Sequence, residues 1–262
     1  MFSVERYLAR IGLDPQVGPP SVALLEALQL AHLVHVPFEN LDAFHRRGVR
    51  TDIDWSYRKI VERQRGGWCF EANGAFGELL RQLGFQTDYV PCQVWESEPA
   101  AWGPLLDHLG LVVQLEGARW FVDVGFGDCC IQPLLIEPGE RSAIPRRARI
   151  EPTVGGFTLA ELMPRDGGPG EWEPQLNVSF KPRQLPAFDG RSTYLQTEPG
   201  LSWTEKAFAT RATDGTGSRV TLHMNVLRTR QGIAESIDLP VANGQWSELL
   251  QHHFGLDDTN RR

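Results

Sequence analysis

The sequence predicts an α+β protein in which helices come first, strands follow, and a smaller α/β piece ends the chain. Apolar residues recur at helical spacing through roughly the first eighty residues. After Gly84 the chain is rich in Val, Tyr, Phe and Trp and is broken by Gly and Pro, as strands are. These changes place the domain boundaries at 1–84, 85–190 and 191–262, and no internal repeat interrupts them.

Helix signals run through the first part of the chain. Ser3 is placed to cap a helix over VERYLARI that stops at Gly12. A second helix opens at Ser21 and ends before Pro37. Asp54 is placed to cap a third helix over WSYRKIVERQ.

A fourth helix is predicted from Cys69 to Leu83. Several large apolar residues of this segment share one helical face, and Gly84 supplies the stop. The residues on that face are Phe76, Leu79, Leu80 and Leu83.

The middle of the chain contains three strand-like runs, FQTDYVPCQVW, HLGLVVQLEGARWFVDVGFG and PQLNVSF. Glu116 and Gly117 form a plausible hairpin turn inside the second run. Residues 137–174 are dense in Pro, Gly and Arg, with only short strand candidates such as GFTLAEL, and are interpreted as loops on a barrel or curved sheet. The last part offers a strand, RVTLHMNVL, and a final amphipathic helix, QWSELLQHHF.

The composition is that of an ordinary soluble globular protein. Of 262 residues, 41% are hydrophobic and 23% are charged, and the formal net charge is -7. A chain with this net negative charge has no overall positive potential that would attract nucleic acid or an anionic membrane. No apolar run approaches the length of a membrane span, and the N-terminus lacks the apolar core of a secretory signal. We therefore expect a cytoplasmic protein with no nucleic-acid or membrane partner.

Cysteine usage points to isolated thiols. The chain has four cysteines, namely Cys69, Cys92, Cys129 and Cys130, which do not make a disulfide scaffold in a chain of this length. No CxxC or His-x-x-x-His spacing suggests zinc, so no metal is expected. The sequence assigns no role to the last three cysteines beyond packing.

Cys69 lies in RGGWCFEANGAF, between a glycine pair and the start of the fourth helix. A cysteine is a weak nucleophile until its pKa, about 8.5 when free, is lowered. The positive end of a helix lowers it, and the unpaired N–H groups of the same helix end are able to bind an oxyanion. Gly66 and Gly67 allow a close approach of the backbone. Taken alone, however, Cys69 is better interpreted as an inert buried thiol.

His108 and Asp123 supply possible partners for this cysteine. Among seven histidines, only His108 begins a strand, and Asp123 interrupts an apolar run on the next strand. A turn at 116–117 puts residue 123 opposite a residue near 110, close to His108. An imidazole would compensate the buried carboxylate and accept the thiol proton. Cys, His and Asp in this order, with the cysteine on a helix, indicate a papain-like site for acyl transfer or hydrolysis.

The same residues resemble a known family, the arylamine N-acetyltransferases. RGGWCFEANGAF resembles the family's RGGxC-aromatic-E-x-N signature, VPFENLD matches its PFEN segment, and DHLGLVVQLEGARWFVDVGFG resembles its histidine strand followed by DVGFG. The correspondence continues weakly through SFKPRQL, YLQTEPGLSW and GSRVTLHMNVL, so that it spans nearly the whole chain.

The resemblance implies a papain-like core made of an N-terminal helical bundle, a central β-barrel and a C-terminal α/β lid. It implies acetyl coenzyme A as the co-substrate and an aromatic amine, hydroxylamine or hydrazine as the acceptor. The triad transfers to Cys69, His108 and Asp123. The substrate pocket would include Phe38, Phe126 and Trp203, and Glu39, Arg65 and Asn73 would support the site without touching substrate.

The chain departs from the family pattern at three positions. Trp68 and Trp203 enlarge an aromatic wall where the family has smaller rings, which puts the acceptor preference in question. Asp107 precedes the histidine where a neutral residue is usual, and an exposed carboxylate there would raise the pKa of His108.

The resulting hypothesis is a ping-pong cycle through an acetyl-Cys69 intermediate. Two alternatives remain open on the sequence. One is a papain-like amide synthase or hydrolase that uses the same triad on another acyl group, and the other is a non-enzymatic protein that binds aromatic ligands. The sequence does not define the physiological acceptor, the groups that contact the coenzyme A phosphates, or the oligomeric state.

Overall fold

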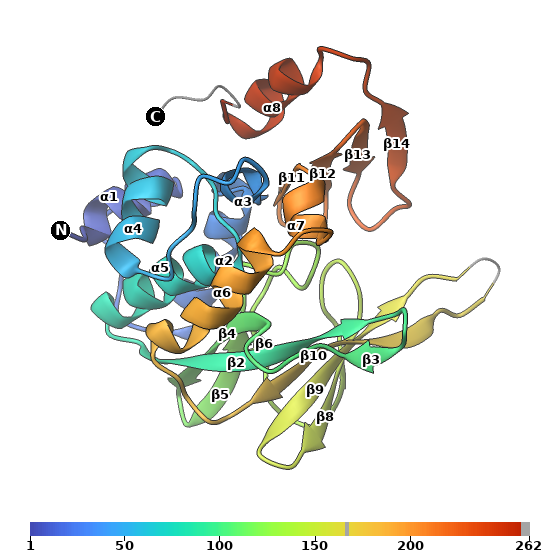
Figure 1. Cartoon of the computed structure of the whole chain (residues 1–262). Coiled ribbons are helices and arrows are strands. Elements are labelled where there is room, and N and C mark those ends of the chain that lie inside the picture. The colour runs from blue at the N-terminus through green and yellow to red at the C-terminus, as the bar shows by residue number, and fades with distance from the viewer. Residues whose placement is uncertain (166–167, 258–262) are drawn as a thin grey trace.

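The computed structural model describes residues 1–165 and 168–257, and its α+β architecture confirms the predicted class (Figure 1). The first part is helical, with α2 and α5 as its longest elements. Its helices are α1 (Val4–Arg10), α2 (Val22–His35), α3 (Leu41–Phe44), α4 (Ile53–Tyr57), a π-helical turn (Arg58–Glu62) and α5 (Cys69–Gln82).

The predicted cap is correct at Ser3, whose side chain accepts a hydrogen bond from a backbone N–H of α1. The second helix begins after Ser21 as predicted, and the Ser21 side chain accepts a hydrogen bond from a backbone N–H of α2. The third helix is present, as α4 and the π-helical turn, but its predicted cap was wrong, because Asp52 and not Asp54 is its N-cap. The Asp52 side chain accepts a hydrogen bond from the Trp55 N–H at 2.7 Å. Asp54 lies in the first helical turn, where its charge still favours the helix N-terminus.

A large antiparallel sheet forms the middle of the molecule and curls against the helices as a half-barrel (Figure 1). Its strands are ordered β6-β5-β4-β2-β10-β9-β8-β7, and β3 (Ala101–Trp102) pairs with β2 outside this path. The strands of the path are β2 (Gln86–Glu96), β4 (His108–Leu115), β5 (Ala118–Val122), β6 (Leu134–Leu135), β7 (Gly139–Arg141), β8 (Ala148–Thr153), β9 (Gly156–Met163) and β10 (Glu171–Ser179).

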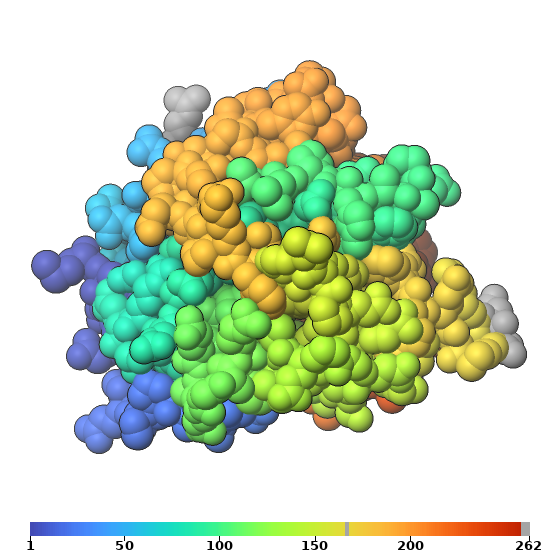
Figure 2. All heavy atoms as spheres, turned by 90° about the horizontal axis from the view of Figure 1, so that it is seen from below, coloured from blue at the N-terminus to red at the C-terminus, as the bar shows by residue number. Residues whose placement is uncertain are grey.

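The interpretation of residues 137–174 as loops was wrong. Most of this segment belongs to β7, β8, β9 and the start of β10, and the β9–β10 hairpin extends away from the rest of the chain (Figures 1 and 2). Pro174 is accommodated locally, since the register shifts by a bulge between Pro174 and Leu176. The predicted hairpin at Glu116 and Gly117 is confirmed, because Leu115 pairs with Ala118.

A second antiparallel sheet joins the end of the chain to its beginning. Its strand order is β1-β11-β12-β13-β14, with β1 (Phe38–Glu39) taken from the helical part. The other strands are β11 (Phe208–Ala212), β12 (Arg219–His223), β13 (Val226–Arg230) and β14 (Ile237–Pro240), and the accompanying helices are a 3₁₀ turn (Leu185–Phe188), α6 (Asp189–Thr197), α7 (Ser202–Glu205) and α8 (Trp246–Phe254). The division of the chain at residues 84 and 190 stays a prediction.

Helix α5 lies at the centre of the main core and packs against β2 and β4. Most of its residues are buried, and the Tyr89 hydroxyl of β2 donates a hydrogen bond to its Gly74 carbonyl at 2.7 Å. Packing of this kind over both faces holds the start of the helix in a fixed position. No helix in the described ranges is both long and apolar enough to cross a membrane.

Candidate active site

The structure brings Cys69, His108 and Asp123 together. Cys69 is the first residue of α5, His108 is the first residue of β4, and Asp123 follows the last residue of β5. His108 Nε2 lies 2.6 Å from Asp123 Oδ2, and the Cys69 side chain is close enough to His108 to contribute to the raised pKa of the imidazole. Because Nε2 faces the carboxylate, Nδ1 is the ring nitrogen that remains for the sulfur.

The register of the β4–β5 hairpin produces this arrangement. Leu111 pairs with Val122, so the next position along brings residue 123 opposite residue 110, as predicted. All three site residues are nearly inaccessible, with exposed fractions of 4% for Cys69, 2% for His108 and 6% for Asp123. Water therefore screens their mutual interactions poorly.

Two residues hold the carboxylate and the loop that follows it. Asn73 of α5 donates hydrogen bonds to Asp123 Oδ1 at 2.8 Å and to the Leu109 carbonyl at 2.6 Å, and its own Oδ1 accepts from the Val124 N–H. Gly125 approaches α5 so closely that a Cβ at this position would lie 2.7 Å from the Cys69 Cα. Only glycine fits here without moving the loop or the helix.

The environment favours a charged imidazole. Burial alone would lower the pKa of His108, but the Asp123 carboxylate, its hydrogen bond and the Cys69 side chain together raise that pKa to about 10. At neutral pH the His108 ring then carries a proton and places a positive charge beside the Cys69 side chain.

The N-terminus of α5 is tied to a buried group of charges. Glu71 Oε2 accepts a hydrogen bond from the Trp68 N–H at 3.2 Å, which closes a capping arrangement around Cys69. Lys59 Nζ lies 2.8 Å from Glu71 and 2.9 Å from Asp42. Burial alone would raise the pKa of Asp42, but the cations Lys59 and Arg65 lower it to about 2.

The predicted pair of Glu39 and Arg65 belongs to this same group, with Arg65 Nη2 2.7 Å from Glu39 Oε1. Sequence reasoning missed its other members, Lys59, Asp42 and Glu71. The signal was weak, because Asp42 and Glu71 are part of motifs that were noticed only as resemblances. A buried lysine is identified as a partner only once α4 and the turn after it are placed beside α5.

The three predicted aromatic residues fall into two groups. Phe38 and Trp203 meet edge to face, with ring centroids 6.1 Å apart. Phe126 instead packs against the His108 ring, at 5.1 Å between centroids. Phe208, which the sequence reasoning missed, lies against both Phe38 and Trp203, and Trp68 meets Trp203 at 5.5 Å. Aromatic rings thus lie against His108 and next to Cys69 in the chain.

The expectation for Asp107 is not met. Its carboxylate is largely covered and forms an ion pair with Arg191 of α6 at 2.7 Å. The charge that raises the pKa of His108 is that of Asp123, so the residue before the histidine serves instead to fasten α6 to the start of β4.

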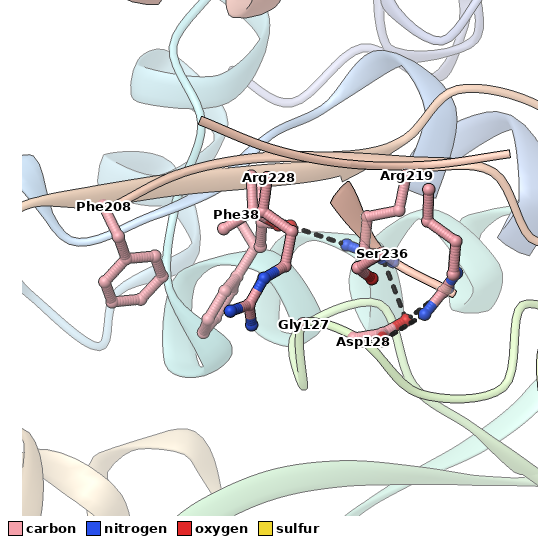
Figure 3. Close-up of a pocket in the computed structure, with 10 residues that line it drawn as sticks. Phe38, Gly127, Asp128, Phe208, Arg219, Arg228 and Ser236 are labelled. Carbon is pink, nitrogen blue, oxygen red and sulfur yellow. Dashed lines mark hydrogen bonds and ion pairs between the residues drawn. The ribbon is translucent and has the colours of Figure 1, made fainter. Parts of the chain in front are cut away.

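A cavity of about 270 Å³ lies between the loop after β5 and the second sheet. Gly127 and Asp128, in the loop after β5, line it on one side, and residues of the second sheet, including Phe38 of β1, line it on the other (Figure 3). Its lining contains three arginines and one carboxylate, namely Arg219, Arg228, Arg230 and Asp128.

The cavity therefore has an excess of positive charge. Asp128 pairs with Arg230 at 2.6 Å and with Arg219 at 3.1 Å. Arg219 is nonetheless almost wholly buried, and its Nη2 donates no hydrogen bond within the described residues. Arg228 extends towards Phe38 (Figure 3) and pairs with the exposed Asp238. The guanidinium group of Arg219 is thus buried and incompletely paired, and a group of this kind attracts anionic ligands.

Comparisons with known proteins agree on one family. A family described as "N-acetyltransferase" matches residues 21–261. An arylamine N-acetyltransferase of Mycolicibacterium smegmatis is 33% identical over 262 residues, covering 96% of this chain and 90% of the relative.

Solved structures give the same result. The M. smegmatis arylamine N-acetyltransferase structure superimposes with a TM-score of 0.88 at 28% identity, covering 98% of this chain and 93% of that one. A Mycobacterium marinum arylamine N-acetyltransferase in complex with CoA has a TM-score of 0.86 at 25% identity, with 97% and 92% covered.

Proposed function

Because the chain belongs to the arylamine N-acetyltransferase family, we propose that it moves an acetyl group from acetyl coenzyme A to an aromatic amine, hydroxylamine or hydrazine through acetyl-Cys69. The observation that carries this proposal is the contact of Cys69, at the first position of α5, with an imidazole that Asp123 holds in its charged form. The triad roles, the intermediate and the pocket residues are part of the proposal.

In the first half of the reaction, the Cys69 thiolate attacks the thioester carbonyl of acetyl coenzyme A. The unpaired N–H groups at the start of α5 stabilise the oxyanion that forms. The carbon–sulfur bond to coenzyme A then breaks, and the departing sulfur takes the proton from His108. The products are free coenzyme A, acetyl-Cys69 and a neutral imidazole.

In the second half, the acceptor nitrogen attacks the acetyl carbon of acetyl-Cys69. His108 takes the proton that the nitrogen loses, and Cys69 leaves as a thiolate, which restores the starting state. Aromatic amines suit this step because their low basicity leaves the nitrogen neutral at pH 7. The rings of Phe38, Phe126 and Trp203 would hold the acceptor and reduce the access of water.

We further propose that the cavity with three arginines receives the phosphates of the donor. Two features support this assignment. The cavity borders the cysteine loop, because Phe38 bridges to Gly67 just before Cys69. Its arginines also carry the charge that phosphates require, and a relative of known structure is in complex with CoA.

The intermediate tests the proposed function directly. The protein is incubated with acetyl coenzyme A without acceptor, and the intact mass and the modified peptide are measured. We expect one acetyl group on Cys69, released when an aromatic hydrazine is added. The Cys69→Ala variant is the control and should neither gain mass nor release coenzyme A. An unmodified Cys69 in the wild-type protein would contradict the proposal.

The donor cavity is tested by Arg228→Ala. Removing this guanidinium should raise KM for acetyl coenzyme A by roughly tenfold, because a hydrogen-bonded charge is worth about 1.5–3 kcal/mol. The KM for the aromatic acceptor should stay within about twofold. The exposed arginine variant Arg165→Ala is the matched control, and equal effects on both KM values in Arg228→Ala would refute the assignment.

A cytoplasmic location also remains a proposal. It is supported by the four cysteines, all of which are free thiols in the structure.

A further inference from the structure

Cys129, Cys130 and Glu161 form a buried cluster that acetyl transfer does not use. The two sulfurs and a carboxylate oxygen all lie within 4.8 Å of one another. Cys130 donates a hydrogen bond from its thiol to Glu161 Oε1 at 3.3 Å. The cysteines come from the loop after β5 and the glutamate from β9, so the fold brings together groups that no short sequence motif connects.

The carboxylate of this cluster is fixed in place. Glu161 is 0% exposed, and its Oε2 lies 2.6 Å from Arg146. The ion pair balances the charge of Glu161 and leaves Oε1 facing the cysteines. When the Cys130 proton leaves, Oε1 becomes available to a cation without disturbing the bond to Arg146.

Gln29 of α2 gives an independent observation. Its side chain and both cysteines line one small cavity of about 10 Å³. Gln29 Nε2 donates to the Cys130 carbonyl at 3.3 Å, whereas its buried Oε1 accepts no hydrogen bond from any described residue. A buried carbonyl oxygen without a donor is costly unless something else occupies the site. The cavity has the size of a single water or ion.

We propose that Cys129, Cys130 and Glu161 form a binding site for a soft divalent cation of the Zn²⁺ class, with Gln29 Oε1 as the fourth ligand. Thiolate sulfur binds such an ion at about 2.3 Å and oxygen at about 2.0–2.2 Å, in tetrahedral geometry. Ligand atoms then lie about 3.5–4 Å apart. The atoms of Cys129, Cys130 and Glu161 are already within 4.8 Å of one another, and Gln29 lines the same small cavity as the two cysteines.

The charges balance on binding. The cation displaces one proton from each cysteine, and the two thiolates neutralise its two positive charges. The Glu161–Arg146 pair stays neutral as a whole. None of the proposed ligands belongs to the triad, although Asp123 also lines the small cavity. The effect of the ion would be to fasten the loop that follows Asp123 to α2 and β9.

The experiment titrates the Cys69→Ala protein with Cd²⁺, an ion that reports its thiolate ligands through ultraviolet charge-transfer absorption. Removing Cys69 excludes binding at the triad. We expect saturation at one Cd²⁺ per chain, displacement by Zn²⁺, and a rise in Tm with either ion. The absence of a saturable band in this protein would refute the proposal.

Variants in the Cys69→Ala background identify the ligands. Cys129→Ala and Cys130→Ala should each abolish tight binding, whereas Cys92→Ala, which removes another buried thiol, should leave the titration unchanged. Gln29→Leu should weaken affinity by roughly tenfold while sparing the Glu161–Arg146 pair. Circular dichroism confirms folding of each variant. An undiminished band in the double variant of Cys129 and Cys130 would place the ion elsewhere and overturn the proposal.

Discussion

At the scale of single residues, the proximity of Cys69, His108 and Asp123 could be predicted, but the residues that support them could be predicted only in part. Cys69 and His108 stand at the first positions of a helix and a strand, and both starts are visible in the sequence. Lys59 gave no comparable signal, because a lysine in a helical segment is usually solvated. Its role depends on three carboxylates that approach it only in the folded chain.

The charge state of His108 gives a prediction at this scale. Since its pKa is raised from 6.5 to about 10, His108 should stay protonated at pH 8. In the Asp123→Asn variant, His108 should titrate at much lower pH, because burial then lowers its pKa with no carboxylate to raise it. Nuclear magnetic resonance of labelled histidine rings measures the pKa of His108 in both proteins. Identical titration curves would show that Asp123 does not raise this pKa.

The same shift has a consequence for stability. The folded state holds the His108 proton more tightly than the unfolded state. The resulting stabilisation is therefore complete below pH 6.5 and is lost as pH rises to about 10.

At the scale of elements, α5 was predicted well and the strands after residue 137 poorly. The helix is strongly periodic and ends at a glycine, so its limits are encoded locally. Strands β8 and β9 depend on partners across the sheet, and their Pro, Gly and Arg content indicates loops when the segment is considered alone. Arg149, for example, covers the face of Trp172 on β10, at 4.7 Å from the ring centroid.

The contact between α5 and the loop after β5 gives a prediction at the element scale. In Gly125→Ala, the added methyl would lie 2.7 Å from the Cys69 Cα, so the loop must move away from the helix. Because a shift of about 1 Å is able to cost a hundredfold in rate, we expect kcat to fall by roughly tenfold to a hundredfold.

Gly190→Ala is the matched control for this variant. Gly190 lies in α6 with nothing within 4 Å of its added Cβ. The change should leave kcat unaltered and stabilise the helix by up to about 1 kcal/mol. Steady-state kinetics and chemical denaturation measure both variants, and a normal kcat in Gly125→Ala would show that this close approach does not position the cysteine.

At the scale of the whole molecule, Asp128 joins the two sheets. Its carboxylate contacts Arg146 beside the large sheet and Arg219 and Arg230 of the second sheet. Burial alone would raise the pKa of Asp128, but these arginines hold it well below its usual value of 3.8. The sequence could not predict this junction, because its members are dispersed over a hundred residues of chain.

The Asp128→Asn variant tests the junction. We expect a loss of about 1–3 kcal/mol in unfolding free energy at pH 7, because part of the carboxylate is exposed and its ion pairs are screened. Since the pKa of Asp128 is lower in the folded state, the carboxylate stabilises the protein above pH 3.8, and this stabilisation declines as pH falls below that value. Urea unfolding of both proteins from pH 7 downwards should therefore show a difference that narrows in acid. A constant difference at all pH values would argue against the charged junction.

The pairing of β1 with β11 has a consequence for how the protein folds during synthesis. Asn40, beside β1, donates hydrogen bonds to the carbonyls of Trp203 and Lys206 and accepts one from the Phe208 N–H. During synthesis the nucleophile leaves the ribosome long before these partners do. When Cys69 has just emerged, the residues that pair with β1 and bind Asn40 have not yet been synthesised. The site around Cys69 is therefore completed only when roughly the last quarter of the chain has been made.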